Sequence, residues 1–287
     1  MVSLRCPICN SKKIEKFWAM PGYRLARCGS CQAVWDPLPP EKFLSLYDKT
    51  YFINENPKGG YTNYFEGMQI NRRTFSDRLG KIEKKLGKKG RLLDVGCALG
   101  DCLLEAKKLG WKEAEGIEIS QYAYEFAKER SLNVKLGTLN ENSYKPNTFD
   151  AVTYQDVIEH ISDPVNELKK IYKIIKPGGI VFLVTPDIGG FWSRLLGPLW
   201  YHYKPHEHLT YFSQKSIRRA LEEAGFTNIE TRKTYHVLSL EYILNRLRYY
   251  FPSFFELMLK IIKKMPFKNI AFRAYTGELE AWGVKTG

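Results

Sequence analysis

Two observations predict an α/β fold built on a doubly wound, mostly parallel sheet. Apolar runs of strand length alternate with helix-length segments across residues 91–185, which is typical of a parallel sheet that helices cover on both faces. The first run, Leu92–Val95, ends in a turn from Gly96 to Gly100, and a helix then begins. Such a turn lets the backbone approach a ligand closely, and the free N–H groups of the helix face that ligand.

The predicted elements alternate along the chain. A helix with a basic end is expected at 66–89, ahead of the sheet. A later helix at 213–224 has Ser213 as its N-cap and stops at Gly225. Two short helical stretches form an insertion at about 238–265. The seven expected strands lie at 91–96, 112–118, 132–137, 148–154, 179–185, 227–237 and 276–285, with further helices at 99–109, 120–130 and 164–175.

An acidic residue on the second strand indicates the kind of ligand. Glu118 lies 22 residues past Gly96, and an acid about 20 residues beyond such a turn binds ribose hydroxyls in doubly wound sheets. The dinucleotide pattern G-x-G-x-x-G is not matched, because Ala98 occupies the second glycine position and the next glycine is Gly100. The sequence therefore predicts a nucleoside-containing cofactor that is smaller than a dinucleotide.

The ordered motifs of residues 60–237 resemble those of class I S-adenosylmethionine-dependent methyltransferases, which have a Rossmann-like fold. The turn 94–100, the strand start 149–152, the segment 156–164 and the turn 176–179 follow in the family's order. The resemblance implies that S-adenosyl-L-methionine is the cofactor. It implies these cofactor-binding residues: Asp94, Gly96, Cys97 and Gly100 around the methionine part, Glu118 with Ile119 at the ribose, Leu139 beside the adenine, and Gln155 facing the sulfonium.

Four cysteines near the N-terminus predict a structural zinc site. Cys6 and Cys9 form one C-x2-C knuckle, and Cys28 and Cys31 form a second. Paired knuckles at this separation present four thiolates to a tetrahedral Zn²⁺, whose binding helps such a small ribbon to fold. Two disulfides are the alternative, but they require an oxidising compartment.

Three regions are predicted from these patterns. Residues 1–40 form the zinc ribbon, 41–89 form an aromatic linker and helical cover, and 90–287 form the methyltransferase domain. The aromatic residues at 41–66 are expected to dock the ribbon on the core, with a lid over the substrate as the alternative.

The positive charge of the chain lies on its flanks. The net charge is +13, of which residues 1–89 carry +9 and residues 238–287 carry +4, whereas 90–237 are neutral. This distribution predicts an anionic or phosphate-bearing small-molecule acceptor. DNA is not an expected partner. RNA is not favoured either, because the chain lacks the Asn/Asp-Pro-Pro-aromatic motif of many enzymes that methylate base nitrogens.

A cytoplasmic location is expected, because no signal peptide is recognised and no apolar run has the roughly 18–20 residues that span a bilayer. The segment at about 253–265 is apolar over much of its circumference and has lysines at its end. It is expected to touch the inner membrane surface, to line a substrate pocket, to form a dimer contact or to pack on the sheet. The oligomeric state is left open.

Three histidines are candidate general bases. His160 follows the fourth strand, and His206 and His208 lie in the segment 205–212, after an aromatic stretch. An imidazole is suited to accept a proton from a hydroxyl or carbon acid near neutral pH. The structural alternatives are that His160 braces the next helix and that the other two hold their loop. A metal at the H-x-H pair is not favoured, because no further ligands follow at suitable spacing.

The predicted function is methyl transfer to an oxygen or carbon of a small molecule, such as a nucleotide- or lipid-linked sugar in glycan or secondary-metabolite biosynthesis. This function follows from the family resemblance and from the basic flanks. An RNA methyltransferase that binds RNA through the zinc ribbon is the main alternative. A non-enzymatic module that binds the cofactor and a partner is the third.

Overall fold

The computed structural model describes residues 4–20, 23–37, 64–205, 207–248, 251–262 and 271–287. The aromatic linker, over 41–63, and the candidate base His206 therefore lie outside the described residues. Among the described helices, none has both the length and the apolar character needed to cross a membrane.

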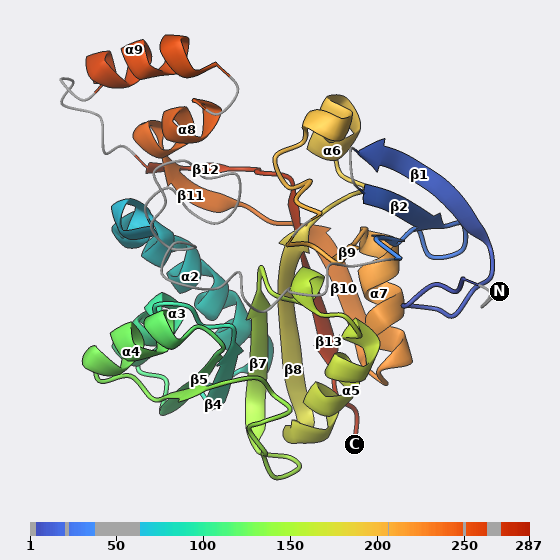
Figure 1. Ribbon diagram of the computed structural model, residues 1–287. Helices are drawn as coiled ribbons and strands as arrows, with labels where there is room; N and C mark the ends of the chain where they lie inside the picture. The colour runs from blue at the N-terminus through green and yellow to red at the C-terminus, as the bar shows by residue number, and fades with distance from the viewer. Residues whose placement is uncertain (1–3, 21–22, 38–63, 206, 249–250, 263–270) are drawn as a thin grey trace.

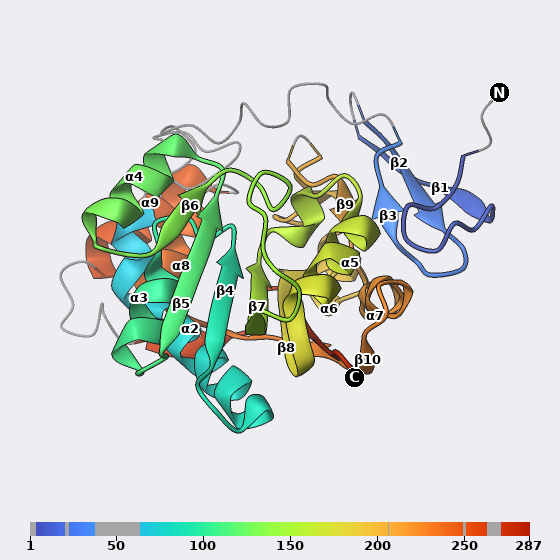
Figure 2. The ribbon, with the colours of Figure 1, turned by 90° about the horizontal axis from the view of Figure 1, so that it is seen from below.

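A seven-stranded sheet in the order β10-β13-β8-β7-β4-β5-β6 lies at the centre of the molecule (Figure 1). Figure 2 shows the strands from β6 to β8 side by side. The strands from β6 to β8 are parallel, and β13 runs antiparallel to both β8 and β10. The predicted doubly wound, mostly parallel α/β sheet is thus confirmed. Its strands are β4 (Arg91–Val95), β5 (Glu113–Glu118), β6 (Val134–Leu136), β7 (Phe149–Gln155), β8 (Ile175–Pro186), β10 (Thr227–Lys233) and β13 (Glu278–Val284).

Helices cover both faces of the sheet through apolar clusters. One cluster joins Ile82 of α2 and Ala106 of α3 to Phe182 of β8. The other joins Ile171 of α5 and Leu221 of α7 to the opposite face. The helices are α2 (Tyr64–Leu86), α3 (Asp101–Lys108), α4 (Gln121–Glu129), α5 (Pro164–Ile174) and α7 (Gln214–Glu223).

The strand order places a ligand crevice beside β4, which pairs with β5 on one side and β7 on the other. Open α/β sheets bind ligands outside the carboxyl ends of their strands, where the order reverses in this way. Asp94, Glu118 and Gln155 lie at the carboxyl ends of β4, β5 and β7. The sheet therefore brings these three predicted site residues to one edge.

Two predicted boundaries are corrected. The strand expected at 227–237 is divided between β10 and β11 (His236–Ser239), which pairs with β12 (Ala271–Ala274) in a separate sheet. The chain changes sheets because Thr234 is anchored at the start of β13, where its N–H donates to the Glu278 carbonyl. The turn expected at 176–179 is instead an irregularity inside β8, where the partner of β7 jumps from Ile175 to Ile180.

The N-terminal region forms a four-stranded sheet with a strand of the main domain. Its strands are β1 (Ile14–Met20), β2 (Tyr23–Cys28), β3 (Val34–Trp35) and β9 (Thr210–Tyr211). Cys28, Cys31 and Trp35 belong to the same buried cluster as Phe212. The ribbon therefore packs directly on the core.

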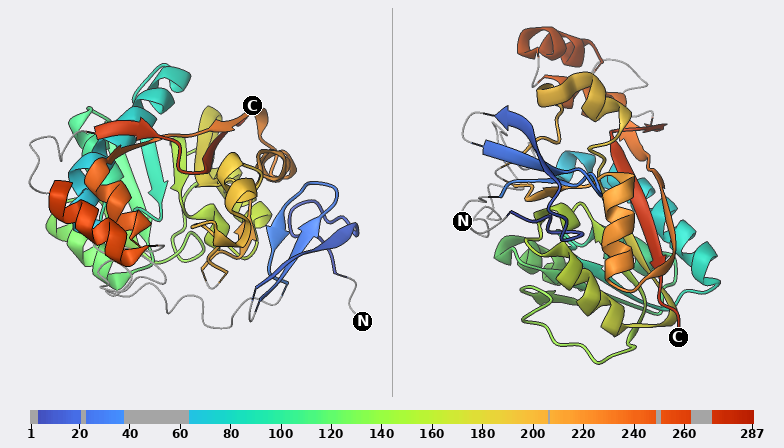
Figure 3. Two further views of the ribbon diagram at one scale, coloured as in Figure 1. Left: turned by 90° about the horizontal axis from the view of Figure 1, so that it is seen from above. Right: turned by 90° about the vertical axis from the view of Figure 1, so that its right-hand side faces the viewer.

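Two helical segments lie beyond the carboxyl edge of the sheet. One is α6 (Phe191–Leu196), which continues into the short η3 (Gly197–Leu199) after β8. The other is the insertion between β10 and β13, with α8 (Leu240–Leu247) and α9 (Pro252–Ile262) between β11 and β12. Seen from above, α8 and α9 lie on the side of the molecule opposite the ribbon (Figure 3).

Candidate active site

The turn after β4 has a backbone that demands glycine at two positions. Gly96 and Gly100 have φ values of +70° and +82°. A Cβ on Gly96 would lie 2.4 Å from a methyl group of Val157, and one on Gly100 would lie 2.4 Å from a methyl group of Leu132. Ala98 between them also has a positive φ, +46°, which costs energy for a residue with a Cβ. This turn lets a ligand approach the main chain closely.

Glu118 is tied to the same turn. Its side chain is buried, with one carboxylate oxygen 2.7 Å from the Ala98 N–H and the other 2.8 Å from the Ser120 N–H. Burial raises its pKa despite these hydrogen bonds, which favour the charged form. Each oxygen has a further lone pair, so the carboxylate can accept two adjacent hydroxyl groups. Glu118 therefore fits the ribose of a nucleoside.

Asp94 and Gln155 are held by hydrogen bonds at the carboxyl ends of β4 and β7. The buried carboxylate of Asp94 accepts a hydrogen bond of 2.5 Å from the Thr153 hydroxyl. Burial raises the pKa of Asp94 to about 6, although neighbouring hydrogen bonds oppose the shift. Gln155 donates to the Cys102 sulfur at 3.4 Å and accepts from Arg78 at 3.0 Å. Its amide is thus held at both ends.

The other predicted cofactor residues differ in exposure. Cys97 is 5% exposed and Leu139 is 8% exposed, whereas Ile119 is 36% exposed beside Glu118. Burial, with the nearby charge of Glu118, raises the pKa of the Cys97 thiol, so it is a poor nucleophile. Ile119 offers an apolar surface next to the ribose position. The roles assigned to these residues stay predictions.

A cluster of charged and polar side chains lies beyond Gln155. Arg78 of α2 reaches from Gln155 to the ring of His236, with 3.0 Å between its Nη2 and the His236 Nε2. The same imidazole nitrogen contacts an Oε2 of Glu278, at the start of β13. Glu278 also faces His202, with 3.8 Å between Oε1 and Nε2. We call Arg78, Asp156, His202, His236 and Glu278 the Glu278 cluster.

The charges of the Glu278 cluster depend on one another. Burial alone would raise the pKa of Glu278, but His236, His202 and Arg78 hold it at about 2. Burial and the charge of Glu278 raise the pKa of Asp156 to about 7. Burial lowers the pKa of His202 to about 4. At neutral pH the cluster therefore holds a charged Glu278 between Arg78 and two imidazoles.

Several buried polar atoms around this cluster have no hydrogen-bond partner among the described residues. The Nε of Arg78 is one of them, and it lies in the cluster itself. Three others come from the loop after α6 and from the chain that leads into β13. These are Trp200 Nε1, Tyr275 Oη and Thr276 Oγ1. Buried polar groups are normally satisfied, so these atoms indicate a place for a polar ligand or bound water.

Sequence reasoning missed the Glu278 cluster. Arg78 lies inside a helix of many basic residues, and Glu278 starts the last strand, so neither forms a motif. His236 was included in a single long strand. His202 lies in the aromatic stretch before the segment 205–212, and a histidine there was the one available signal.

His160 and His208 pack against each other. Their ring centroids are 4.8 Å apart, and the Nδ1 of His160 lies 2.7 Å from the carbonyl oxygen of Glu207. With Glu159 they bring three ligand-type atoms within 4.8 Å of one another. Burial lowers the pKa of His160 to about 4 and also lowers that of His208 well below its usual value. Both are neutral at pH 7, and their catalytic role stays a prediction.

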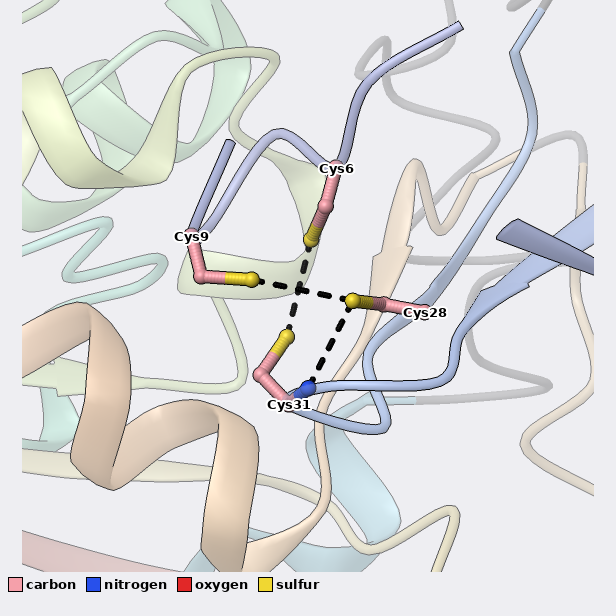
Figure 4. Close-up of side chains that lie close together, drawn as sticks. All are labelled: Cys6, Cys9, Cys28 and Cys31. Carbon is pink, nitrogen blue, oxygen red and sulfur yellow. Dashed lines mark hydrogen bonds between the residues drawn. The ribbon is translucent and has the colours of Figure 1, made fainter. Parts of the chain in front are cut away.

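The four predicted zinc ligands converge at one point (Figure 4). The sulfur atoms of Cys6 and Cys31 are 3.5 Å apart, and those of Cys9 and Cys28 are 3.6 Å apart. Four thiolates around Zn²⁺ at about 2.3 Å lie about 3.8 Å from each other, close to this spacing. The backbone N–H groups of Ile8 and Cys31 point at Cys6 and Cys28 sulfurs. The arrangement fits a tetrahedral metal.

Comparison with protein families gives a match over most of the catalytic core. Residues 66–231 match the model of a family described as "Methyltransferase domain". A ubiquinone biosynthesis O-methyltransferase of Thiobacillus denitrificans is 30% identical over 169 residues, which cover 54% of this chain and 72% of the relative. A demethylmenaquinone methyltransferase of Staphylococcus aureus is 27% identical over 180 residues, covering 53% and 75%.

Solved structures share the fold at lower identity. A phosphoethanolamine N-methyltransferase of Haemonchus contortus, in complex with S-adenosyl-L-methionine, matches with a TM-score of 0.58 and 18% identity. The match covers 88% of this chain and 64% of that chain. A SAM-dependent methyltransferase from Archaeoglobus fulgidus has a TM-score of 0.53 and 19% identity, covering 77% and 99%.

Proposed function

Because the chain belongs to this methyltransferase family and is a class I S-adenosylmethionine-dependent methyltransferase, we propose that it methylates an oxygen or carbon of a polar small molecule. The observation that carries the proposal is the position of Gln155. Its amide contacts Cys102 beside the cofactor turn and Arg78 of the Glu278 cluster. The cofactor site and a polar site thus share one side chain.

The residues of the crevice fit the cofactor. Glu118 is positioned to accept the ribose hydroxyls, and the Gly96–Gly100 turn leaves room for the methionine part. S-adenosylmethionine supplies a methyl group on a positively charged sulfur. The protein must align the acceptor atom with that methyl group and exclude competing water. Gln155, held at both ends, provides a rigid edge for this alignment.

The acceptor site favours a polar molecule that carries negative charge or hydroxyl groups. Arg78 provides a buried positive charge, and Lys204 lies near enough to affect the pKa of Asp156. A nucleotide- or lipid-linked sugar fits this chemistry. One relative is named as a ubiquinone biosynthesis O-methyltransferase and another as a demethylmenaquinone methyltransferase, and this likeness favours a quinone-related acceptor.

Cofactor binding tests the proposal directly. Glu118→Ala removes a charged hydrogen-bond acceptor and should weaken S-adenosylmethionine binding by about 1–3 kcal/mol, measured by titration calorimetry. Glu113→Ala, at the exposed opposite end of the same strand, is the matched control and should bind normally. Equal affinity of both variants and the wild type would refute the ribose role of Glu118.

We further propose that the four N-terminal cysteines bind one structural Zn²⁺ per chain. All four positions of a tetrahedral metal would be taken by protein thiolates, which leaves none for a substrate. Metal analysis of the purified protein should find about one zinc per chain, and the Cys28→Ser/Cys31→Ser double variant should have none. Disulfide-bonded cysteines without metal would contradict the proposal.

For α9 we propose a peripheral contact with an anionic membrane surface. Phe254 and Leu257 are 59% and 58% exposed, and Lys260 lies on the same helix. Glu256 offsets the charge of Lys260, but Lys263 and Lys264 follow the helix in the sequence. An apolar helix face followed by basic residues favours the interface of an anionic bilayer. Co-sedimentation with phosphatidylglycerol vesicles should be lost in the Phe254→Ser/Leu257→Ser variant. Equal sedimentation of variant and wild type would exclude this contact.

A further inference from the structure

The contact between His236 and Glu278 has the geometry of a proton-accepting pair. Nε2 of His236 lies against an Oε2 of Glu278. A charged carboxylate can only accept a hydrogen bond, and His236, His202 and Arg78 keep Glu278 charged at neutral pH although burial opposes the charge. The same Nε2 also lies 3.0 Å from Nη2 of Arg78, which is a donor, but its contact with Glu278 is the shorter one and favours a proton on Nε2. With the proton there, the lone pair of the ring lies on Nδ1. No hydrogen bond to this Nδ1 is made within the described part of the chain.

The pair is placed beside the reacting edge of the cofactor site. Arg78 spans both, because its Nη1 donates to Gln155 at 3.0 Å and its Nη2 lies 3.9 Å from Glu278 Oε2. A base must lie within reach of the acceptor while a third group orients it. Here Glu278 orients the ring of His236, and Arg78 fixes the distance from that ring to Gln155.

We propose that His236 is the catalytic base that takes the proton from a hydroxyl group of the methyl acceptor, with Glu278 and Arg78 as its positioning residues. The proposal rests on the methyltransferase function proposed above, and it names the acceptor class. Hydroxyl groups need this help because their pKa lies far above 7, whereas an amine is nucleophilic once it is neutral.

The step is balanced in atoms and charge. The hydroxyl oxygen forms a bond to the methyl carbon while the carbon–sulfur bond breaks, and the sulfur keeps that electron pair. The proton of the hydroxyl moves to Nδ1 of His236. The resulting imidazolium is neutralised by Glu278 through Nε2–H, and it returns the proton to water after the products leave.

The surroundings of the pair favour an acceptor with several polar groups. Trp200 Nε1, Tyr275 Oη and Thr276 Oγ1 are buried near it and have no partner among the described residues. A Cβ on Gly277 would lie 3.1 Å from that Trp200 nitrogen, so the indole of Trp200 lies against the chain that leads into Glu278. Hydroxyl groups of a sugar or of a diphenol would satisfy such atoms, and an apolar ring would not.

The first experiment measures methyl transfer to defined probes: catechol, methyl α-D-glucopyranoside and UDP-glucose as hydroxyl acceptors, and benzylamine as an amine. On the best hydroxyl probe, His236→Gln should lower kcat by about 10²–10⁴ while the affinity for S-adenosylmethionine changes less than about twofold. Glutamine can still donate to Glu278 but has no basic atom. Glu278→Gln should also lower kcat, and Glu280→Gln, a buried carboxylate two residues along the same strand, should not.

The pH profile separates a base from a structural residue. Wild-type kcat should fall at low pH with an inflection that His236→Gln loses. The charged and titratable groups that face His236 are Glu278, Arg78, His202, Asp156 and Lys204. Asp156 titrates near 7, so Asp156→Asn is measured as well and should keep the inflection. An unchanged profile in His236→Gln would overturn the proposal.

Two further results would overturn it without touching the methyltransferase function. One is wild-type transfer to benzylamine but to none of the hydroxyl probes. The other comes from ¹⁵N NMR of the imidazoles at pH 8, which needs no acceptor: a proton on Nδ1 of His236 instead of Nε2 would exclude the pair. Failure to bind S-adenosylmethionine at all would instead refute the proposed function.

Discussion

Val34 and Tyr211 lie opposite each other in the antiparallel pair that joins the ribbon to the main domain. Tyr211 also packs on Tyr203, at 5.4 Å between ring centroids, and Tyr203 packs on Trp200 at the same distance. Trp200 lies 5.2 Å from His202, which faces Glu278. A continuous set of contacts therefore runs from the cysteine knuckles to the Glu278 cluster.

Metal loss should for this reason loosen the loop that β9 belongs to. We expect removal of the metal by a chelator, or the Cys28→Ser/Cys31→Ser variant, to increase hydrogen exchange of the amides in 207–212. Metal binding supplies much of the folding energy of such a ribbon, and β3 holds β9 only while the ribbon is folded. Exchange measured by mass spectrometry checks this.

The control for that measurement keeps all four thiolates. Ser30→Ala removes a hydroxyl between Cys28 and Cys31 that bonds Ser11 at 2.8 Å, and it should leave exchange in 207–212 near the wild-type rate. Affinity for S-adenosylmethionine should be unchanged in each case, because Glu118 and the Gly96 turn follow strands of the seven-stranded sheet, whereas β9 belongs to the four-stranded sheet of the ribbon. Unchanged exchange after metal removal would show that β9 holds its place without the ribbon.

The fold could be predicted because its signals are local. The apolar runs that became β4, β5, β7 and β8 each end near the expected residue, and caps such as Ser213, whose side chain bonds the Ser216 N–H, mark their helices. Glu118 could be found because its position follows from the length of one βαβ unit.

The Glu278 cluster could not be predicted because its members come from distant parts of the chain. Arg78 and His236 are separated by 158 residues, and His236 and Glu278 by 42. Each looks ordinary in its own segment. Only the return of the chain through the β11–β12 insertion to β13 brings them together.

Ala98 offers a test of the strained turn. A left-handed conformation costs a residue with a Cβ about 1–2 kcal/mol, whereas a glycine adds only about 0.5–1 kcal/mol of unfolded-state entropy. Ala98→Gly should therefore raise the free energy of unfolding by up to about 1 kcal/mol, measured by urea denaturation. Ala123→Gly, at a buried site inside α4, should lower it by about 1 kcal/mol. Equal losses in both would mean that Ala98 is not strained.

Asp150 should stabilise the fold at neutral pH. Its carboxylate accepts hydrogen bonds from Lys176 at 2.7 Å and from the Arg91 N–H at 2.9 Å, and pairs with Lys88 at 2.7 Å. Burial opposes the charge, but these partners lower the pKa from 3.8 to about 2. A carboxyl group whose pKa is lower in the folded than in the unfolded protein stabilises the fold at pH values above its unfolded pKa. This stabilisation is lost as the pH falls from 3.8 toward 2.

We expect Asp150→Asn to cost about 2 kcal/mol of unfolding free energy at pH 7, with a smaller difference from the wild type near pH 2. Denaturation at several pH values checks this. Glu125→Gln, at an exposed position on α4, should cost little at any pH. If the unfolding free energy of Asp150→Asn were lower than that of the wild type by the same amount at every pH, the lysines would not be lowering the pKa of Asp150.

The buried histidines predict a second pH dependence, at higher pH. Burial lowers the pKa values of His160 and His202 from 6.5 to about 4, and it lowers the pKa of His208 well below 6.5. A histidine whose folded pKa lies below its unfolded value stabilises the protein above about 6.5, and that stability is lost as the pH falls toward 4. Each such histidine contributes a slope of about 1.4 kcal/mol per pH unit in this window.

Between about pH 6 and pH 4.5, His208→Gln should reduce the slope of the unfolding free energy against pH by the contribution of one protonating histidine. The comparison with the wild type matters, because Asp94 and Asp156 have raised pKa values and oppose the effect in both proteins. The difference between the two slopes removes their contribution. His208 is 5% exposed and packs on His160 and Tyr211, so its protonation must disrupt the loop that carries it. An identical slope in variant and wild type would mean that His208 takes up its proton without unfolding, as an exposed catalytic base would.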